Sequence, residues 1–153
     1  MENIDSAQMI ISHVTEGTKL AEKYNLPNEI KDFITTHHGQ GKTKYFYVQY
    51  KNAHPDEDVD DLLFTYPGPN PFTKEQAILM MADTVEAASR SLPDYTEKSI
   101  RELVERLIDG QVADGFFRDC PITFRDIAYA KTVLIEKLKT IYHTRLSYPE
   151  LKK

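Results

Sequence analysis

IKDFITTHHG, residues 30–39, carries the pattern from which the fold class of this chain is predicted. One face of the expected helix is formed, at the spacing i, i+3, i+4, i+7, by Ile30, Phe33, Ile34 and His37. His38 follows Ile34 by four residues and so lies beside the same face, and Gly39 is of the type expected just beyond a helix C-terminus. Two imidazoles are therefore expected to project from the last turn of a helix towards the core.

The same helical periodicity recurs along the chain, whereas strand patterns are nearly absent. Helices are expected from Asp5 or Ser6, from Pro27 to His38, from Lys42 to Ala53, after a Thr73–Gln76 capping box, from Thr96 to Gly110 and after Thr123. The sequence thus predicts an all-α bundle of about six helices.

Three details of this bundle follow from local patterns. In the first helix, one inward face is predicted to hold Ile10, His13, Val14, Gly17 and Ala21, with Gly17 allowing a close approach. The helix after Thr73 is apolar nearly all round over residues 77–82, so it is expected to be the central one. Phe124 and Ala128 are expected to face inward on the last helix, and residues 148–153 to form a loose tail.

Composition places the chain among ordinary globular domains. It has 153 residues, of which 41% are hydrophobic and 28% charged, enough for one domain with a real core. The net charge of -5 argues against a DNA- or RNA-backbone binder. The single cysteine, Cys120, can form no internal disulfide and fits a reducing compartment, and no apolar run approaches 18 residues.

Four side chains stand out as candidates for chemistry: His13, His37, His38 and Asp83. Each is expected on or beside a buried helix face, and packed helices can bring such groups together. The alternative for each histidine is a core imidazole satisfied by one hydrogen bond. For Asp83, which shares a polar stripe with Glu86 and Arg90, the alternative is a structural ion pair with Arg90, or a Glu86–Arg90 pair at i, i+4 spacing.

Imidazole and carboxylate together suit iron, manganese, zinc and similar divalent ions. Two such ions can generate a hydroxide nucleophile and hold a phosphoryl group. The sequence contains no P-loop, GxGxxG or GxSxG motif, and we interpret Cys120 as structural. Metal-dependent hydrolysis is therefore favoured over the other common enzyme chemistries, with no catalytic residue separable from the metal ligands.

Five segments, in order, resemble a known family: ISHV (11–14), HHG (37–39), FTYPGPNPFTKE (64–75), MADTVEAASR (81–90) and CPITFRDI (120–127). They are similar to the cytoplasmic HD domain of the seven-transmembrane HD, or PgpH-like, cyclic di-AMP phosphodiesterases. The resemblance covers nearly the whole chain. The Tyr-Pro-Gly-Pro loop and the Asp-x-x-Glu-Ala-Ala-x-Arg stretch are its most specific parts.

The resemblance implies a helical metallophosphohydrolase that converts cyclic di-AMP to pApA with iron or manganese, zinc or nickel being further candidates. It implies that His13, His37 and His38 serve one metal ion and that Asp83 serves another. It also implies that Arg90 supports the site or contacts phosphate, that Glu86 belongs to the same stripe, and that Tyr66 lines the nucleotide cleft.

The sequence departs from the family pattern at one important place. The family pattern begins with a histidine and a His-Asp pair upstream, but this chain has no histidine before His13 and no His-Asp pair anywhere. Residues 1–153 are therefore expected to be the C-terminal portion of one HD domain, incomplete at its N-terminus, with one metal site incomplete and with little or no activity. Missing helices would also expose an apolar groove and so promote self-association.

Two other functions stay open. One is a non-catalytic HD-like module that senses nucleotides or binds a protein partner, and the other is an HD hydrolase for a different nucleotide. In each reading the chain is expected in the cytoplasm, without DNA, RNA or direct membrane contact, and the phosphodiesterase is expected to bind a cyclic dinucleotide. The resemblance implies a parent protein anchored in the membrane.

Overall fold

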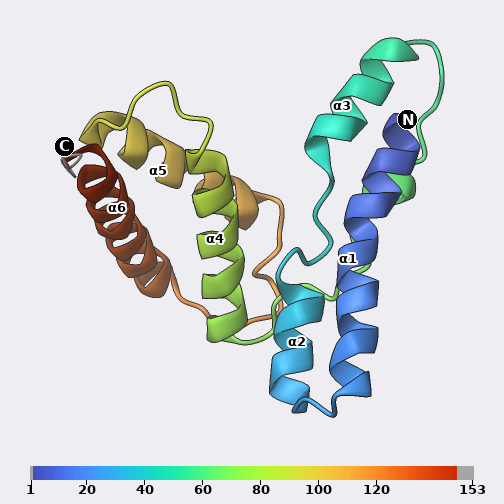
Figure 1. Cartoon of the computed structure of the whole chain (residues 1–153), viewed down its shortest axis with the longest axis horizontal. Coiled ribbons are helices and arrows are strands. Elements are labelled where there is room, and N and C mark those ends of the chain that lie inside the picture. The colour runs from blue at the N-terminus through green and yellow to red at the C-terminus, as the bar shows by residue number, and fades with distance from the viewer. Residues whose placement is uncertain (1, 148–153) are drawn as a thin grey trace, which may run out of the picture. The chain divides into compact units, whose positions relative to one another are not determined.

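The computed structural model describes residues 2–147, with side chains described as far as residue 143. In that part of the chain the elements are α1 (Asn3–Lys23), α2 (Asn28–Thr36), α3 (Lys44–Ala53), the 3-10 helix η1 (Asp61–Phe64), α4 (Lys74–Ser89), α5 (Glu97–Ala113) and α6 (Phe124–Ser147) (Figure 1). The described residues form no strand beyond an isolated antiparallel bridge between Lys42 and Thr65. The all-α prediction with about six helices is confirmed, and the predicted tail, 148–153, lies outside the described residues.

The helices fall into two compact units, Met1–Phe72 and Thr73–Lys153. The first unit holds α1, α2, α3 and η1, and the second holds α4, α5 and α6. The assignment of the whole chain to one HD domain stays a prediction.

In the first unit, α1 and α2 lie side by side and run in opposite directions (Figure 1). Gly17 permits this approach, because a Cβ atom there would lie 3.2 Å from Cγ2 of Ile34. The predicted close contact at Gly17 is thereby confirmed. The predicted place of Ile10 is wrong: its side chain is 42% exposed, and Ile11 is buried in its place.

The start of α1 also differs from the prediction. The helix begins at Asn3, with Glu2 as the N-cap residue and without a side-chain cap. The amide of Ser6 already donates to the carbonyl of Glu2 at 3.1 Å, so the backbone is helical before either predicted cap. Asp5 instead lies in the first turn, where its negative charge interacts favourably with the positive end of the helix dipole.

The aromatic residues of α3 contribute little to the core. No residue of this helix is buried, and Tyr45 is 67% exposed. Tyr47 and Tyr50 pack their rings against Phe64, which is fully buried, with centroid distances of 5.6 Å in both pairs. The helix is therefore held by one side to η1.

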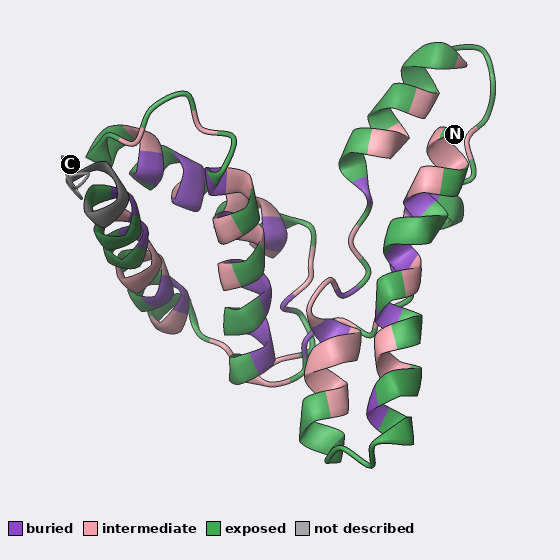
Figure 2. Ribbon diagram, viewed as in Figure 1, coloured by how far each residue is buried: buried purple, intermediate pink, exposed green. Residues whose placement is uncertain are grey.

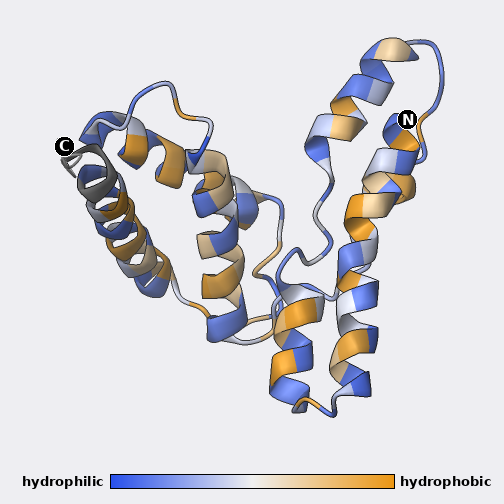
Figure 3. Ribbon diagram, viewed as in Figure 1, coloured by the Kyte–Doolittle hydropathy of each residue, from blue (hydrophilic) through white to orange (hydrophobic). Residues whose placement is uncertain are grey.

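The second unit has its own hydrophobic core between α4, α5 and α6. Its largest fully buried side chains are those of Met81, Ile100 and Ile108, followed by the smaller Val85 and Val104. Figure 2 shows the buried positions of α4 along one side of the helix, and Figure 3 shows apolar and polar residues alternating along α6. The central position predicted for α4 is wrong in part, because Ile78 and Leu79 are 37% and 41% exposed.

The ends of the helices in this unit follow local side-chain chemistry. The predicted capping box is present in full, with Thr73 accepting from the Gln76 amide and the Gln76 side chain accepting from the Thr73 amide. The prediction that Gly110 ends α5 is wrong: the helix continues to Ala113, and Gly115, with a φ of 82°, lies just beyond its end.

Two predicted inward positions at the start of α6 are also wrong. Phe124 is 83% exposed and Ala128 is exposed, whereas Ile127 and Ala130 are buried. None of the helices in the described part of the chain combines the length and the apolar character needed to cross a bilayer.

Candidate metal centre

Three of the four predicted ligands come together in the first unit. His13 lies in the middle of α1, His37 is the C-cap residue of α2, and His38 follows it. One ring nitrogen of each lies within 4.8 Å of the corresponding atoms of the other two. The packing of α1 against α2 thus joins residues that are 24 positions apart in the sequence.

The orientation of two of these rings is fixed by backbone carbonyls of their own helices. Nδ1 of His37 lies 2.6 Å from the carbonyl oxygen of Ile34, and Nδ1 of His13 makes the equivalent contact with Ile10. A carbonyl can only accept, so each Nδ1 is assigned a proton, and the matching tautomer of the imidazole has its lone pair at Nε2. Such carbonyl contacts are the usual outer support of metal-binding histidines.

The two lone pairs face each other, with 3.1 Å between Nε2 of His13 and Nε2 of His37. Two nitrogens bound to one Zn²⁺ ion at about 2.1 Å would lie roughly 3.0–3.4 Å apart at bond angles between about 90° and 110°. The donor atoms therefore fit a shared divalent cation, which would also relieve the repulsion between the lone pairs.

The electrostatics of His38 favour the form that binds metals. Its burial, with further contributions from charge on His37 and His13, lowers the pKa of the imidazole from 6.5 to about 4. His38 is therefore neutral at pH 7, and a neutral imidazole is the form that coordinates a cation.

The burial of the cluster differs from the prediction. His37 and His38 are half-buried, and His13 is exposed, so the rings do not point into a closed core. The pair lies at and just beyond the C-terminal end of α2, and His13 lies on α1 next to the exposed position of Ile10. A ligand from solution can thus reach the cluster within this unit.

Tyr66, predicted to line a nucleotide cleft, lies directly on the histidines. Its ring stacks on that of His38 with 4.4 Å between centroids and 16° between planes. The ring of His13 lies at 73° to that of the same tyrosine, with 5.9 Å between centroids. No sequence pattern indicates this contact, because Tyr66 is 28 residues from His38 and follows a loop rather than a helical repeat.

The other predicted site residues, Asp83, Glu86 and Arg90, lie along α4 in the second unit. Asp83 is exposed, so the expectation of a buried carboxylate is wrong; it occupies the outward side of a helix that is buried on one side only. The Arg90 guanidinium donates to both Glu86 carboxylate oxygens, at 3.1 and 2.5 Å, and this contact raises the pKa of Arg90. The alternative of a Glu86–Arg90 ion pair is thereby confirmed.

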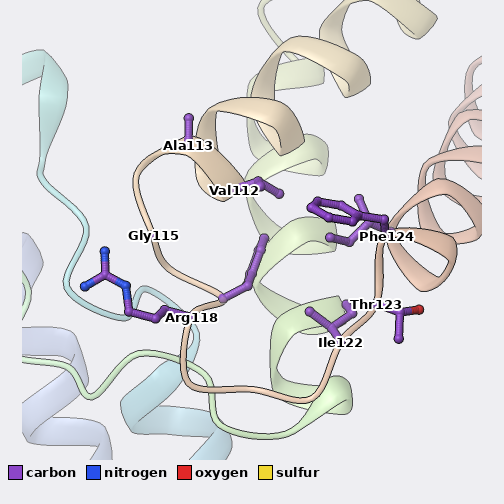
Figure 4. Close-up of a pocket in the computed structure, with 9 residues that line it drawn as sticks. Val112, Ala113, Gly115, Arg118, Ile122, Thr123 and Phe124 are labelled. Atoms are coloured by element: carbon purple, nitrogen blue, oxygen red, sulfur yellow. The ribbon is translucent and has the colours of Figure 1, made fainter.

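The second unit also has a hollow of about 480 Å³ where α5 ends and α6 begins (Figure 4). Its lining combines apolar side chains such as Val112 and Ile122 with Arg118. None of the predicted site residues lines this hollow. The predicted site residues therefore lie elsewhere in the described part of the chain.

Comparison with known proteins gives relatives that include two cyclic-di-AMP phosphodiesterases. No protein-family model matches the chain. The cyclic-di-AMP phosphodiesterase PgpH of Bacillus subtilis is 38% identical over 148 residues, which are 97% of this chain and 20% of that protein. PgpH of Listeria monocytogenes is also 38% identical, over 95% of this chain and 20% of its own length.

A solved structure agrees with these relatives. The crystal structure of the L. monocytogenes PgpH HD domain in complex with cyclic-di-AMP matches with a TM-score of 0.88 and 36% identity, over 93% of this chain and 65% of that one. The chain spans about a fifth of the length of the curated relatives and about two thirds of the solved domain. In sequence and in fold, over nearly its whole length, this chain is a homologue of part of the HD domain of the PgpH cyclic-di-AMP phosphodiesterases.

Proposed function

We propose that this chain forms the three-histidine metal site of a phosphodiesterase domain that hydrolyses cyclic di-AMP to pApA in the parent protein. The observation that carries the proposal is the pair of Nε2 atoms 3.1 Å apart, each on a ring whose Nδ1 contacts a backbone carbonyl. The relatives support the substrate, because both are cyclic-di-AMP phosphodiesterases and the solved HD domain holds cyclic-di-AMP.

In this proposal, a bound divalent ion supplies a Lewis acid for the phosphoryl oxygen and lowers the pKa of a bound water. His13 and His37 hold the ion through Nε2, and their Nδ1 contacts keep the correct nitrogen available. His38 adds a third neutral nitrogen. The exposed side of His13 leaves the ion accessible to a phosphate group.

Asp83 takes a different role in the proposal. It serves a second ion, together with ligands of the kind that a His-Asp pair supplies, and this chain contains no such pair. The chain by itself therefore holds one ion and hydrolyses cyclic di-AMP slowly or not at all. Glu86 orients the Arg90 guanidinium through their hydrogen bonds, and we assign substrate contacts to Arg90 and, separately, to Tyr66.

Iron or manganese is the proposed metal in the parent protein, while zinc or nickel also suits imidazole ligands. Elemental analysis of the purified chain tests the site, with a His37→Ala/His38→Ala double variant as the comparison. We expect about one metal ion per molecule of the unsubstituted chain and none in the variant. Equal metal content in the two proteins would contradict the proposal.

Hydrolysis is tested on a protein extended to the full length of the solved HD domain. Chromatography of the products should show pApA from cyclic di-AMP and a slower reaction with cyclic di-GMP. Tight binding of cyclic di-AMP without any hydrolysis would instead favour a nucleotide-sensing module, and faster hydrolysis of another nucleotide would favour a different HD hydrolase.

The proposal includes a place in the cell and a mode of association. We propose that the domain works on the cytoplasmic side of a membrane-anchored parent protein. We also propose that copies of the chain associate through exposed apolar surface. Sedimentation of the purified chain tests the association, and a monomer at all concentrations would contradict it.

A further inference from the structure

The loop after η1, residues 66–70, is bound to the turn that carries the histidine pair. The amide of Tyr66 donates to the carbonyl of Gly41 at 2.8 Å. At the other end of the loop, the Gln40 amide donates to Oδ1 of Asn70 at 2.8 Å, and the Asn70 side chain returns a hydrogen bond to the Gln40 side chain at 3.3 Å. Both ends of the loop are thus tied to residues that follow His38 by two and three positions.

The middle of the loop contacts the same turn without room for a side chain. Gly68 has a φ of 77°, and a Cβ atom there would lie 2.8 Å from Cγ of Gln40. A larger residue at this position would have to strain its own backbone and push the turn away. The loop and the turn therefore form one packed element.

The Tyr66 ring connects this loop to His38, a candidate metal ligand. It is 7% exposed, belongs to a small buried cluster with Ile11 and Val14, and covers one face of His38 with nearly parallel planes. His13 and His37 are oriented by carbonyls of their own helices. For His38, which lies beyond the end of α2, the tyrosine face supplies an orienting contact from outside the helix.

We propose that the 66–70 loop is a positioning element that sets the ring of His38 for metal binding, with the Tyr66 ring as its contact surface. The inference rests on the proposed three-histidine metal site. It gives Tyr66 a role through His38, in addition to the role towards the nucleotide. Outer contacts of this type change metal affinity by about 10- to 100-fold when they are removed.

The first test is a competition titration of the chain with Zn²⁺ at pH 7. Tyr66→Leu keeps an apolar side chain in the cluster but removes the flat ring, and Tyr66→Phe restores that ring. We expect the Leu variant to bind Zn²⁺ about 10- to 100-fold more weakly and the Phe variant to bind like the parent chain. Parent-like affinity in the Leu variant, or equal losses in both variants, would overturn the proposal.

The second test approaches the loop from Gly68, where the nearest neighbours of an added Cβ atom belong to Gln40 and not to a histidine. Gly68→Ala should also weaken Zn²⁺ binding, because it displaces the turn through Gln40. Gly115→Ala is the matched control: Gly115 has a φ of 82° and a similarly short approach, to Arg118, but lies in the second unit. If both glycine variants lose stability and neither loses affinity, the loop does not position the site.

A measurement on the metal-free chain separates this inference from the proposed function. The ring protons of His38 lie over the Tyr66 ring, so their NMR resonances should move towards random-coil positions in Tyr66→Leu and stay in place in Tyr66→Phe. That result in a parent chain that binds no metal would refute the proposed function and support the positioning role. Unchanged His38 resonances in the Leu variant would overturn the positioning role itself.

Discussion

At the scale of single residues, the proposed metal site depends on which nitrogen each imidazole presents. The Nδ1 contacts of His13 and His37 leave Nε2 for coordination, and those two atoms are 3.1 Å apart. Asp83 belongs to the other compact unit, where it is exposed on α4. The donor set that the structure brings together therefore consists of three histidines.

Replacing one ligand at a time tests this donor set. His13→Gln should weaken Zn²⁺ binding by about 100-fold or more, because loss of a direct ligand exceeds the loss of an outer contact. Asp83→Asn should leave the affinity of this chain unchanged. Both values come from competition titration with a chromophoric chelator.

The control for these variants is His54→Gln. His54 stacks on Tyr50 at 4.2 Å and contacts the carbonyl of the same residue, so it is engaged elsewhere in the first unit. Its replacement should not change Zn²⁺ affinity. A loss in Asp83→Asn as large as that in His13→Gln would show that the carboxylate binds the same ion.

At the scale of secondary-structure elements, the start of α6 contributes a pH dependence to stability. The Thr123 amide donates to the Asp126 carboxylate at 3.0 Å, and Lys74 forms an ion pair with the same carboxylate at 3.0 Å. These contacts, the amide first, lower the pKa of Asp126 from 3.8 to about 2. Because the folded pKa lies below the unfolded one, the contribution is complete above about pH 4 and is lost as the pH falls towards 2.

Urea unfolding between pH 2 and pH 5 measures this effect. The parent chain should lose stability over that range more steeply than Asp126→Asn, which keeps the cap but cannot titrate. Parallel curves for the two proteins would show that Asp126 contributes no pH dependence. Added salt should reduce the part of the difference that is due to Lys74.

Gly110 offers a second prediction at this scale. It lies inside α5, three residues before the end, and nothing lies within 4 Å of a Cβ atom placed there. Gly110→Ala should therefore raise the free energy of unfolding by about 0.5–1 kcal/mol, because alanine loses less backbone entropy in a helix. Thermal and urea unfolding both measure this free energy. A lower free energy of unfolding in the variant would contradict the prediction.

These elements also show what the sequence can predict. The Thr73–Gln76 cap is predictable because all its contacts lie within four residues. The end of α5 is not, because Gly110 and Gly115 are equally suitable glycines and the backbone turns at the second. Likewise, whether Ile10 or Ile11 faces inward depends on the packing partners of α1, which the helical repeat does not specify.

The candidate site divides in the same way. The residue types and the expected end of a helix are local features, and they are enough to point to His37 and His38. The meeting of this pair with His13 depends on the packing of α1 on α2, which is not local. The support by Tyr66 joins positions 28 residues apart through a loop, and no local repeat predicts such a contact.

At the scale of the whole molecule, the histidines lie in one compact unit while the larger hydrophobic core lies in the other. A ligand stabilises the structure that binds it, by about 2.7 kcal/mol when its free concentration is a hundred times Kd. Zn²⁺ should therefore slow hydrogen exchange in α1, α2 and the turn after His38, and leave exchange in α4, α5 and α6 unchanged.

Hydrogen exchange followed by mass spectrometry, with and without Zn²⁺, measures both units in one experiment. His37→Ala/His38→Ala should lose the protection of the first unit, because the ion then has no site. Equal protection of both units would contradict the prediction, and Asp83→Asn then identifies the cause. If Zn²⁺ slows exchange only in the first unit of Asp83→Asn, the carboxylate shares the ion. If Zn²⁺ still slows exchange in both units of that variant, the two units unfold cooperatively, as in a single domain.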